Sequence, residues 1–162
     1  MPRLILLNGP AACGKSTLAR MYVERHPLAL ALDVDRVRDL IGGWRDHRGP
    51  AGLLARAIAL AAAREHLAAG HDVVVPQLLA RPQFIEQLET LDAEFHEIVL
   101  VDDLENVLRR DAVRGDGNDP GEITELYHRL MALLPARPRA RLIRLRDGDV
   151  EGAYQDVLDA LT

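Results

Sequence analysis

The chain has 162 residues, 48% hydrophobic and 28% charged, a composition typical of a single globular domain, which we expect to span residues 1–162. Its net charge of −5 excludes the overall basic field that draws proteins to nucleic acid. One cysteine excludes an internal disulfide and a cysteine-built zinc site, and no apolar run is long enough for a membrane span or a signal peptide, so we expect a cytoplasmic protein without membrane partners.

The first predicted elements are a strand, a glycine-rich loop and a helix. Residues 4–8 form an apolar run typical of a buried strand, and residues 18–23 can continue as a helix. The loop between them matches the phosphate-binding pattern G-x-x-x-x-G-K-[ST], in which glycines let successive backbone N–H groups point at phosphate oxygens. We therefore predict that a nucleotide's phosphates are bound by Gly9, Pro10, Ala11, Ala12, Cys13, Gly14, Lys15, Ser16 and Thr17.

Three residues of this loop carry more specific expectations. Lys15 is the only lysine in the chain, and we expect its ammonium group to reach the β- and γ-phosphates. We expect the Ser16 hydroxyl to ligate Mg²⁺. Cys13 is expected to contribute its backbone rather than a nucleophilic thiol.

The rest of the sequence alternates between strand and helix patterns. Apolar runs predict four more strands, at residues 28–32, 72–77, 96–101 and 141–145. Helices are predicted at 36–41, 53–69, 81–94, 104–113, 122–134 and 150–161, with a polar loop at 44–52 and the most flexible composition at 115–121. This alternation predicts an α/β fold, a parallel sheet with helices on both faces.

Ligands of such sheets bind at the carboxyl ends of the strands. That edge receives Asp33 and Asp35 after the second predicted strand, and further polar residues after the later strands: Gln77, Asp102, Asp103, Arg146 and Asp147. Asp35 and Arg38 are three residues apart, so they share a helix face, where a carboxylate could accept a hydroxyl proton and a guanidinium could hold an acceptor or a phosphate. The alternative is that Asp35 caps the helix or stabilises its positive end, and that Arg38 pairs with it at the surface.

On these residues the sequence resembles the small P-loop kinases, which include chloramphenicol phosphotransferase, the zeta-toxin kinases and the kinase module of polynucleotide kinase. The resemblance implies a three-layer P-loop fold with five parallel strands in the order 2-3-1-4-5. It implies that Asp35 is the general base and that Arg38 contacts the acceptor. It also implies that Arg110 and Arg114, spaced R-x-x-x-R on a lid at about residues 109–122, hold the triphosphate and stabilise the transferring charge.

One feature departs from the pattern of many P-loop enzymes. The third predicted strand ends in Pro76-Gln77 instead of an aspartate on the water shell of Mg²⁺. Either Asp33 or Asp35 then shares that duty, or the metal is held by Ser16, phosphates and water. We expect Gln77 to face the acceptor pocket.

Together these features predict a kinase that uses ATP and Mg²⁺ to phosphorylate a hydroxyl of a small molecule, such as an antibiotic, a nucleoside or a metabolite. Residues 41–54 and 78–82 are expected to determine which acceptor binds. One alternative is a polynucleotide 5′-hydroxyl kinase, against which the acidic charge and the few aromatic residues count. The other is a nucleotide-binding or ATP-hydrolysing protein without a phosphoryl acceptor.

Overall fold

Five parallel strands form one sheet in the order β2-β3-β1-β4-β5 in the computed structural model, which describes residues 1–162. The strands are β1 (Arg3–Asn8), β2 (Leu30–Ala31), β3 (Val73–Pro76), β4 (Glu94–Val101) and β5 (Arg141–Arg144). All four neighbouring pairs are parallel, so every carboxyl end lies at the same edge of the sheet. The predicted strand order and direction are confirmed.

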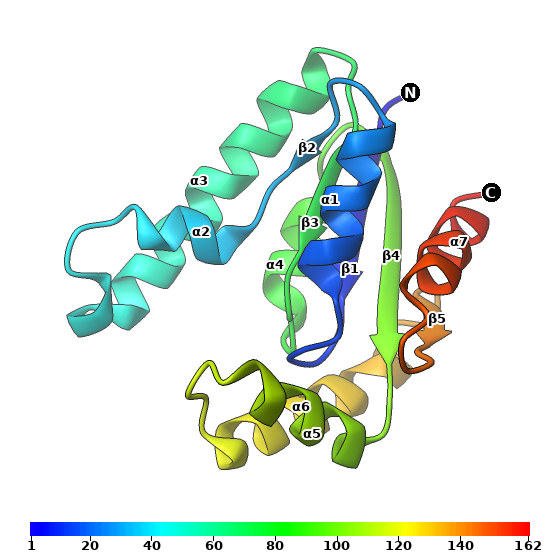
Figure 1. Cartoon of the computed structure of the whole chain (residues 1–162). Helices are drawn as coiled ribbons and strands as arrows, with labels where there is room; N and C mark the ends of the chain where they lie inside the picture. Colours follow the sequence, from blue (N-terminus) through cyan, green and yellow to red (C-terminus); the bar gives the residue numbers. More distant parts are fainter.

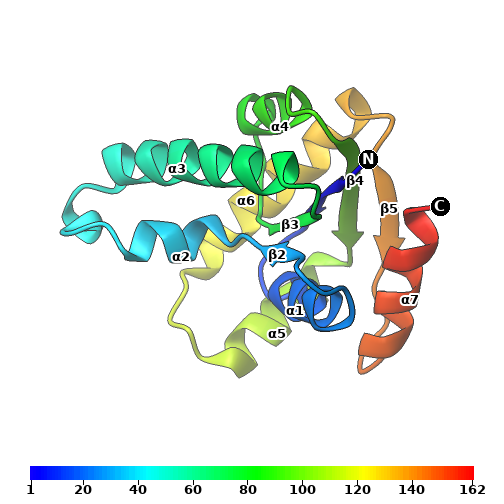
Figure 2. The same ribbon diagram turned by 90° about the horizontal axis from the view of Figure 1, so that it is seen from above.

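Helices cover both faces of the sheet, which confirms the predicted three-layer α/β fold (Figure 2). On one face lie α3 (Arg48–Ala68) and α4 (Pro82–Glu89), and on the other α1 (Lys15–Arg25) and α7 (Val150–Ala160). Three helices lie toward the carboxyl ends of the strands: α2 (Val34–Asp39), α5 (Leu104–Arg114) and α6 (Pro120–Leu133) (Figure 1). Two short 3₁₀ helices complete the fold, η1 (Trp44–Asp46) and η2 (Leu134–Ala136).

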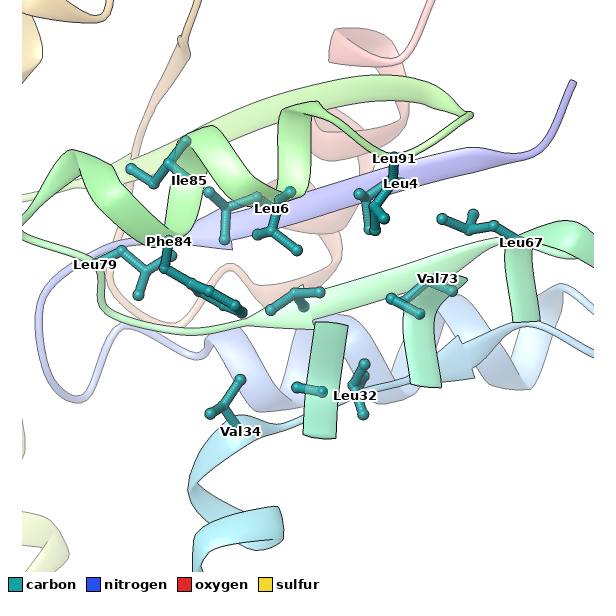
Figure 3. Packing of buried hydrophobic residues seen from close by; sticks show 14 of the residues in the cluster. Leu4, Leu6, Leu32, Val34, Leu67, Val73, Leu79, Phe84, Ile85 and Leu91 are labelled. Atoms are coloured by element: carbon teal, nitrogen blue, oxygen red, sulfur yellow. The ribbon is translucent and has the colours of Figure 1, made fainter. Parts of the chain in front are cut away.

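Two hydrophobic clusters fill the spaces between the sheet and its helices. Successive side chains of a strand point to opposite faces, so Leu4 and Leu6 of β1 join the cluster under α3 and α4, whereas Ile5 and Leu7 join the cluster under α1 and α7. Figure 3 shows the first cluster, where Phe84 and Ile85 of α4 face β1 and β3. Burial on both faces explains why the central strands read as continuous apolar runs.

An alanine stripe sets how closely α3 packs. Ala51, Ala55, Ala59 and Ala63 recur every four residues and are at most 1% exposed. Residues at this spacing lie on one face of a helix, and their small side chains let the α3 backbone approach its neighbours closely. No helix of the fold, α3 included, has the length and apolar composition needed to cross a membrane.

Several predicted boundaries were wrong by two residues or more, among them those of α3, α4 and β2. α3 begins at Arg48, not at residue 53, because Pro50 falls in its first turn, where a missing N–H costs no hydrogen bond. α4 ends at Glu89, not at 94, and Thr90 closes it by donating its hydroxyl to a carbonyl of the last turn. The predicted strand at 28–32 pairs only over Leu30–Ala31.

The alanine stripe gives a stability prediction. We expect Ala59→Leu to lower the free energy of unfolding by about 1–3 kcal/mol, because a filled interface must shift to admit the larger side chain. Urea unfolding followed by circular dichroism measures the change. Ala57→Leu on the exposed side of the same helix is the matched control and is expected to change stability by less than about 0.5 kcal/mol. Equal stability of the two variants would contradict the close packing of α3.

Candidate functional site

The phosphate-binding loop lies between the end of β1 at Asn8 and the start of α1 at Lys15, the strand–loop–helix context that the motif requires. Gly14 is the N-cap of α1 and adopts a left-handed conformation with φ of 81°. A Cβ on Gly9 would lie 3.1 Å from both the Cβ and the carbonyl oxygen of Leu100, so a side chain there would crowd β4. The two glycines of the motif are therefore required for different reasons, one for conformation and one for space.

Asn8 ties the start of this loop to the segment after β3. Its side chain is buried, and its Oδ1 accepts hydrogen bonds from the N–H groups of Gly9 (2.8 Å) and Leu79 (2.9 Å). Its Nδ2 donates to the carbonyl of Leu79 at 2.9 Å. The sequence analysis missed this residue, although a lone amide that ends an apolar strand just before a glycine was a visible signal.

Lys15 folds over the loop that contains it. Its ammonium group donates to the carbonyl oxygens of Gly9 at 3.0 Å and Pro10 at 2.6 Å. Burial lowers the pKa of Lys15. Burial also raises the pKa of the Cys13 thiol, which keeps it protonated at neutral pH.

A cavity of about 560 Å³ opens beside the loop and is lined by residues of α2, α5 and α6. Nine residues predicted from the sequence line it together: Ala11, Ala12, Lys15, Ser16, Asp33, Asp35, Arg38, Gln77 and Arg114. They come from four separate stretches of the chain, at residues 11–16, 33–38, 77 and 114. The fold therefore brings the predicted metal and acceptor residues and part of the predicted phosphate site to one space, whereas Arg110 and the other predicted loop residues do not line it.

Asp35 lies in the first turn of α2 and is hydrogen-bonded to Gln77, the residue that follows β3. Gln77 donates its Nε2 to Asp35 Oδ1 at 3.2 Å, and the guanidinium of Arg38 lies 3.7 Å from the same oxygen. The cap of α2 is Asp33, whose Oδ1 accepts from the Asp35 N–H at 2.9 Å. Asp33, not Asp35, is therefore the cap, but Asp35 does lie at the positive end of α2 and pairs with Arg38, as the alternative also allowed. The Asp35 side chain is 58% exposed.

Two buried polar atoms beside Asp35 have no hydrogen-bond partner in the protein, Arg38 Nε and Gln77 Oε1. The first is a donor and the second an acceptor, and burying such groups unpaired is costly. Arg38 Nε can donate to an oxygen of a bound molecule, and Gln77 Oε1 can accept from a separate donor. Arg38 is fixed further by packing its guanidinium 4.0 Å from the centre of the Trp44 ring system.

The R-x-x-x-R spacing predicted that Arg110 and Arg114 act on the same ligand, but the surroundings of Arg110 are different. Its Nη2 lies 2.6 Å from Asp102 Oδ2, its Nε donates to the Ala12 carbonyl at 3.1 Å, and its Nη1 donates to Asp147 at 3.0 Å. It lines a smaller cavity of about 190 Å³, between the loop and the start of α7. Arg110 thus connects the phosphate-binding loop to the ends of β4 and β5.

Asp102 is the buried anchor of this connection. Burial by itself would raise the pKa of Asp102, but hydrogen bonds from Asn106 and from the Asp103 N–H, together with Arg110, outweigh it and lower the pKa. The neighbouring Asp103 instead forms an exposed ion pair with Arg144. The sequence analysis placed both aspartates at the ligand edge but could not separate their roles.

Arg114 lies one turn beyond Arg110 and lines the large cavity, where it pairs with Asp116 at 2.6 Å. The two arginines therefore do not share one cavity, because Asp102 and the Ala12 carbonyl hold Arg110 on the other side of the loop. Asn118 of the predicted lid segment donates to buried Asp111 at 2.9 Å. Arg109 is exposed and pairs with Asp147.

No group of three or more histidine, cysteine, aspartate or glutamate side chains in the fold is arranged to hold a metal ion. Of the oxygen-bearing side chains that line the large cavity, Ser16 and Asp33 also line a common recess beside α1. A hydroxyl and one carboxylate fit the usual protein share of a Mg²⁺ site, which is completed by phosphates and water.

A family model described as an AAA domain matches residues 4–134. Among solved structures, the fold is similar to a gluconokinase from Sinorhizobium meliloti 1021, with a TM-score of 0.72, 18% identity, and coverage of 99% of this chain and 91% of that one. It is also similar to a tunicamycin resistance protein from Deinococcus radiodurans, with a TM-score of 0.69, 18% identity, and coverage of 99% and 96%. No curated protein sequence matches the chain.

The Asp102 contacts predict a pH-dependent contribution to stability. At pH 7 we expect Asp102→Asn to lower the free energy of unfolding by about 1–3 kcal/mol, because the variant weakens a buried charge pair. A lowered pKa stabilises the folded state above the unfolded-state value of about 3.9, and this stabilisation is lost as the pH falls through the folded value. The difference between wild type and variant should therefore shrink below about pH 4.

Urea unfolding at a series of pH values measures this difference. Asp103→Asn is the matched control, and its exposed ion pair is expected to contribute less than about 1 kcal/mol at any pH. A cost of Asp102→Asn that stays constant from pH 7 to pH 3 would show that its charge is not what stabilises the fold.

Proposed function

This chain belongs to the AAA-domain family of small P-loop kinases, and we propose that it transfers the γ-phosphoryl group of ATP to a hydroxyl of a small molecule. One observation carries the proposal. Lys15 of the phosphate-binding loop and the Asp35–Arg38–Gln77 group line the same cavity, and Arg38 Nε of that group is a donor without a partner in the protein, beside the Asp35 carboxylate. The resemblance on which the sequence analysis relied is thus confirmed at the level of the family.

In this proposal the loop and α1 hold the nucleotide. The loop N–H groups and the start of α1 bind the phosphates, and the Lys15 ammonium group exchanges its carbonyl partners for phosphate oxygens. Ser16 and Asp33 would hold Mg²⁺, which supplies charge neutralisation at the phosphates. The smaller cavity, lined by Arg110 and the start of α7, would take the nucleoside.

The acceptor half of the proposal assigns the proton to Asp35. The acceptor hydroxyl donates to the Asp35 carboxylate and accepts from Arg38 Nε. As its oxygen bonds to the γ-phosphorus, the proton passes to Asp35, and the bond to the β–γ bridging oxygen breaks so that ADP leaves with that electron pair. Arg114, on the same cavity, would stabilise charge on the transferring group.

The size of the cavity favours a small acceptor over a polynucleotide. About 560 Å³ lies within the roughly 300–1,000 Å³ typical of small-molecule pockets. The net charge of −5 gives no field that would attract a nucleic acid backbone. The two structural neighbours named above, a gluconokinase and a tunicamycin resistance protein, are compatible with a small acceptor, although at 18% identity they share only the fold.

An acceptor screen tests this function. γ-Labelled ATP with Mg²⁺ is incubated with polyols, sugar acids, nucleosides, aminoglycosides, phenylpropanoid antibiotics and 5′-hydroxyl oligonucleotides. We expect labelled product on a small molecule. Label on oligonucleotides alone would overturn the small-molecule proposal. Free phosphate as the sole product across the screen would favour an ATP-hydrolysing protein without an acceptor.

The proton assignment predicts the effect of Asp35→Asn. We expect acceptor phosphorylation to fall by about 10²–10⁴-fold, because an amide cannot take the proton, with the Kd for ATP unchanged. Steady-state kinetics and nucleotide titration measure the two quantities. Asp39→Asn removes a carboxylate one turn further along α2, near the same Arg38, and should retain activity within about threefold. Unchanged phosphorylation by Asp35→Asn would exclude it as the base.

The loop assignment predicts the effect of Lys15→Met. We expect the Kd for Mg²⁺–ATP to rise about tenfold or more, because a charge-assisted contact to the phosphates is lost. Isothermal titration calorimetry measures the change in Kd. The matched control is Arg64→Met, which removes one positive charge from the exposed side of α3 and should leave the Kd unaltered. If both variants bind ATP as the wild type does, the ammonium group does not contact the phosphates.

A further inference from the structure

Two further cavities lie next to the large cavity, on the side away from the phosphate-binding loop. The first, of about 90 Å³, is lined by Asp35, Arg38, Arg56 and residues 77–79. The second, the distal cavity, has a volume of about 520 Å³ and lies between α3, α4 and α6. Leu78 lines all three spaces, so they are neighbours, and we refer to them together as the cleft.

The charge of this distal cavity is opposite to that of the chain. Its charged lining residues are all arginines, Arg56, Arg81 and Arg129, and no aspartate or glutamate lines it. Arg129 pairs with Glu125 on its own helix, whereas Arg56 and Arg81 make no ion pair with any carboxylate of the protein. In a protein of net charge −5, two unneutralised guanidinium groups in one cavity are a local cationic site.

Arg56 lies where the two parts of the cleft meet. It comes from α3, is half-buried, and lines both the small cavity beside Asp35 and the distal cavity. Its guanidinium lies over Gly52, one turn earlier on α3, with Nη1 3.7 Å from the place a Cβ would occupy. This position lets one guanidinium face a ligand whose hydroxyl is at Asp35.

Apart from Gln83 and Gln87, the remaining walls are apolar. Leu79 and Phe84 form a buried floor, and Leu53 and Leu126, which are 66% and 38% exposed, face the same cavity from α3 and α6. Apolar walls reduce the access of water to the guanidinium groups and so strengthen their attraction for an anion. A planar guanidinium matches a carboxylate or a phosphate with two parallel hydrogen bonds.

We propose that the distal cavity binds an anionic group, a carboxylate or a phosphate, that is carried by the hydroxyl-bearing acceptor, with Arg56 and Arg81 as its partners. This inference rests on the proposed function and narrows it: the substrate class is a hydroxylated organic anion. Arg56 and Arg81 bind and orient that anion, and the proton still passes to Asp35.

Isothermal titration calorimetry tests the binding, with the loop first saturated by Mg²⁺ and a non-hydrolysable ATP analogue so that no probe binds there. The probes are two matched pairs, gluconate with sorbitol and glucose 6-phosphate with glucose, which separate a carboxylate from a phosphate. We expect one anion of the pairs to bind at least tenfold more tightly than its neutral partner. Equal binding within both pairs, or no binding by any probe, overturns the inference.

Variants assign the preference to the two arginines. Arg56→Gln and Arg81→Gln, singly and together, are expected to raise the Kd of the preferred anion about tenfold or more and to leave that of its neutral partner unchanged. Arg64→Gln removes the same charge from the exposed side of α3 and should change neither. Arg81 lies on an exposed loop, so its variant is expected to fold even if Arg56→Gln does not. A preference that survives in the double variant overturns the assignment.

Phosphoryl transfer to the same probes separates this inference from the proposed function. If anions bind through Arg56 and Arg81 but no label is transferred to any acceptor, the anion site stands and the kinase proposal fails. If label is transferred to neutral acceptors and charged analogues are rejected, the kinase proposal stands and the anion site is overturned.

Discussion

The whole site depends on how the end of β1 is fastened to the segment that follows β3. Asn8 accepts from the N–H groups of Gly9 and Leu79, and the Gln77 N–H donates to the Leu7 carbonyl at 3.1 Å. The phosphate-binding loop and the Gln77–Leu79 segment therefore start from one rigid point, although they are some seventy residues apart in sequence. Because Gln77 contacts Asp35 and Leu79 lines the distal cavity, this point also positions both parts of the acceptor cleft.

The balance of positive and negative side chains differs between the two parts of the cleft. Around the loop, Lys15, Arg38 and Arg114 are balanced by Asp33, Asp35 and Glu122, so a Mg²⁺–triphosphate and a proton acceptor can coexist there. Further along, Arg56 and Arg81 have no such balance. In our proposal Arg56 and Arg81 attract an anionic acceptor, and this attraction does not depend on the bound nucleotide. Selection of the acceptor would then be separate from the binding of ATP.

The sequence predicts the parts of this molecule that depend on local patterns. The loop motif, the five strands and the clustering of Asp33, Asp35 and Gln77 at one edge follow from apolar periodicity and from the geometry of parallel sheets. The partners of Arg110 do not, since Asp147 is 37 residues away and Ala12 is 98. One-turn spacing places Arg110 and Arg114 on one helix face, but buried Asp102 decides which cavity each of them lines.

The fold constrains the elements on the nucleotide side of the site more tightly than those on the acceptor side. The nucleotide half is built on β1, the central strand, where a side chain on Gly9 would crowd β4, so it tolerates little variation. The acceptor half uses α2, the start of α3 and one face of α6, which lie beside the sheet and contact the core through few side chains. Substitutions there change the shape and charge of the cleft without disturbing strand pairing. The same fold can therefore keep one nucleotide site while its acceptor changes, and in our proposal the arginines of α3 and of the loop before α4 determine the acceptor of this chain.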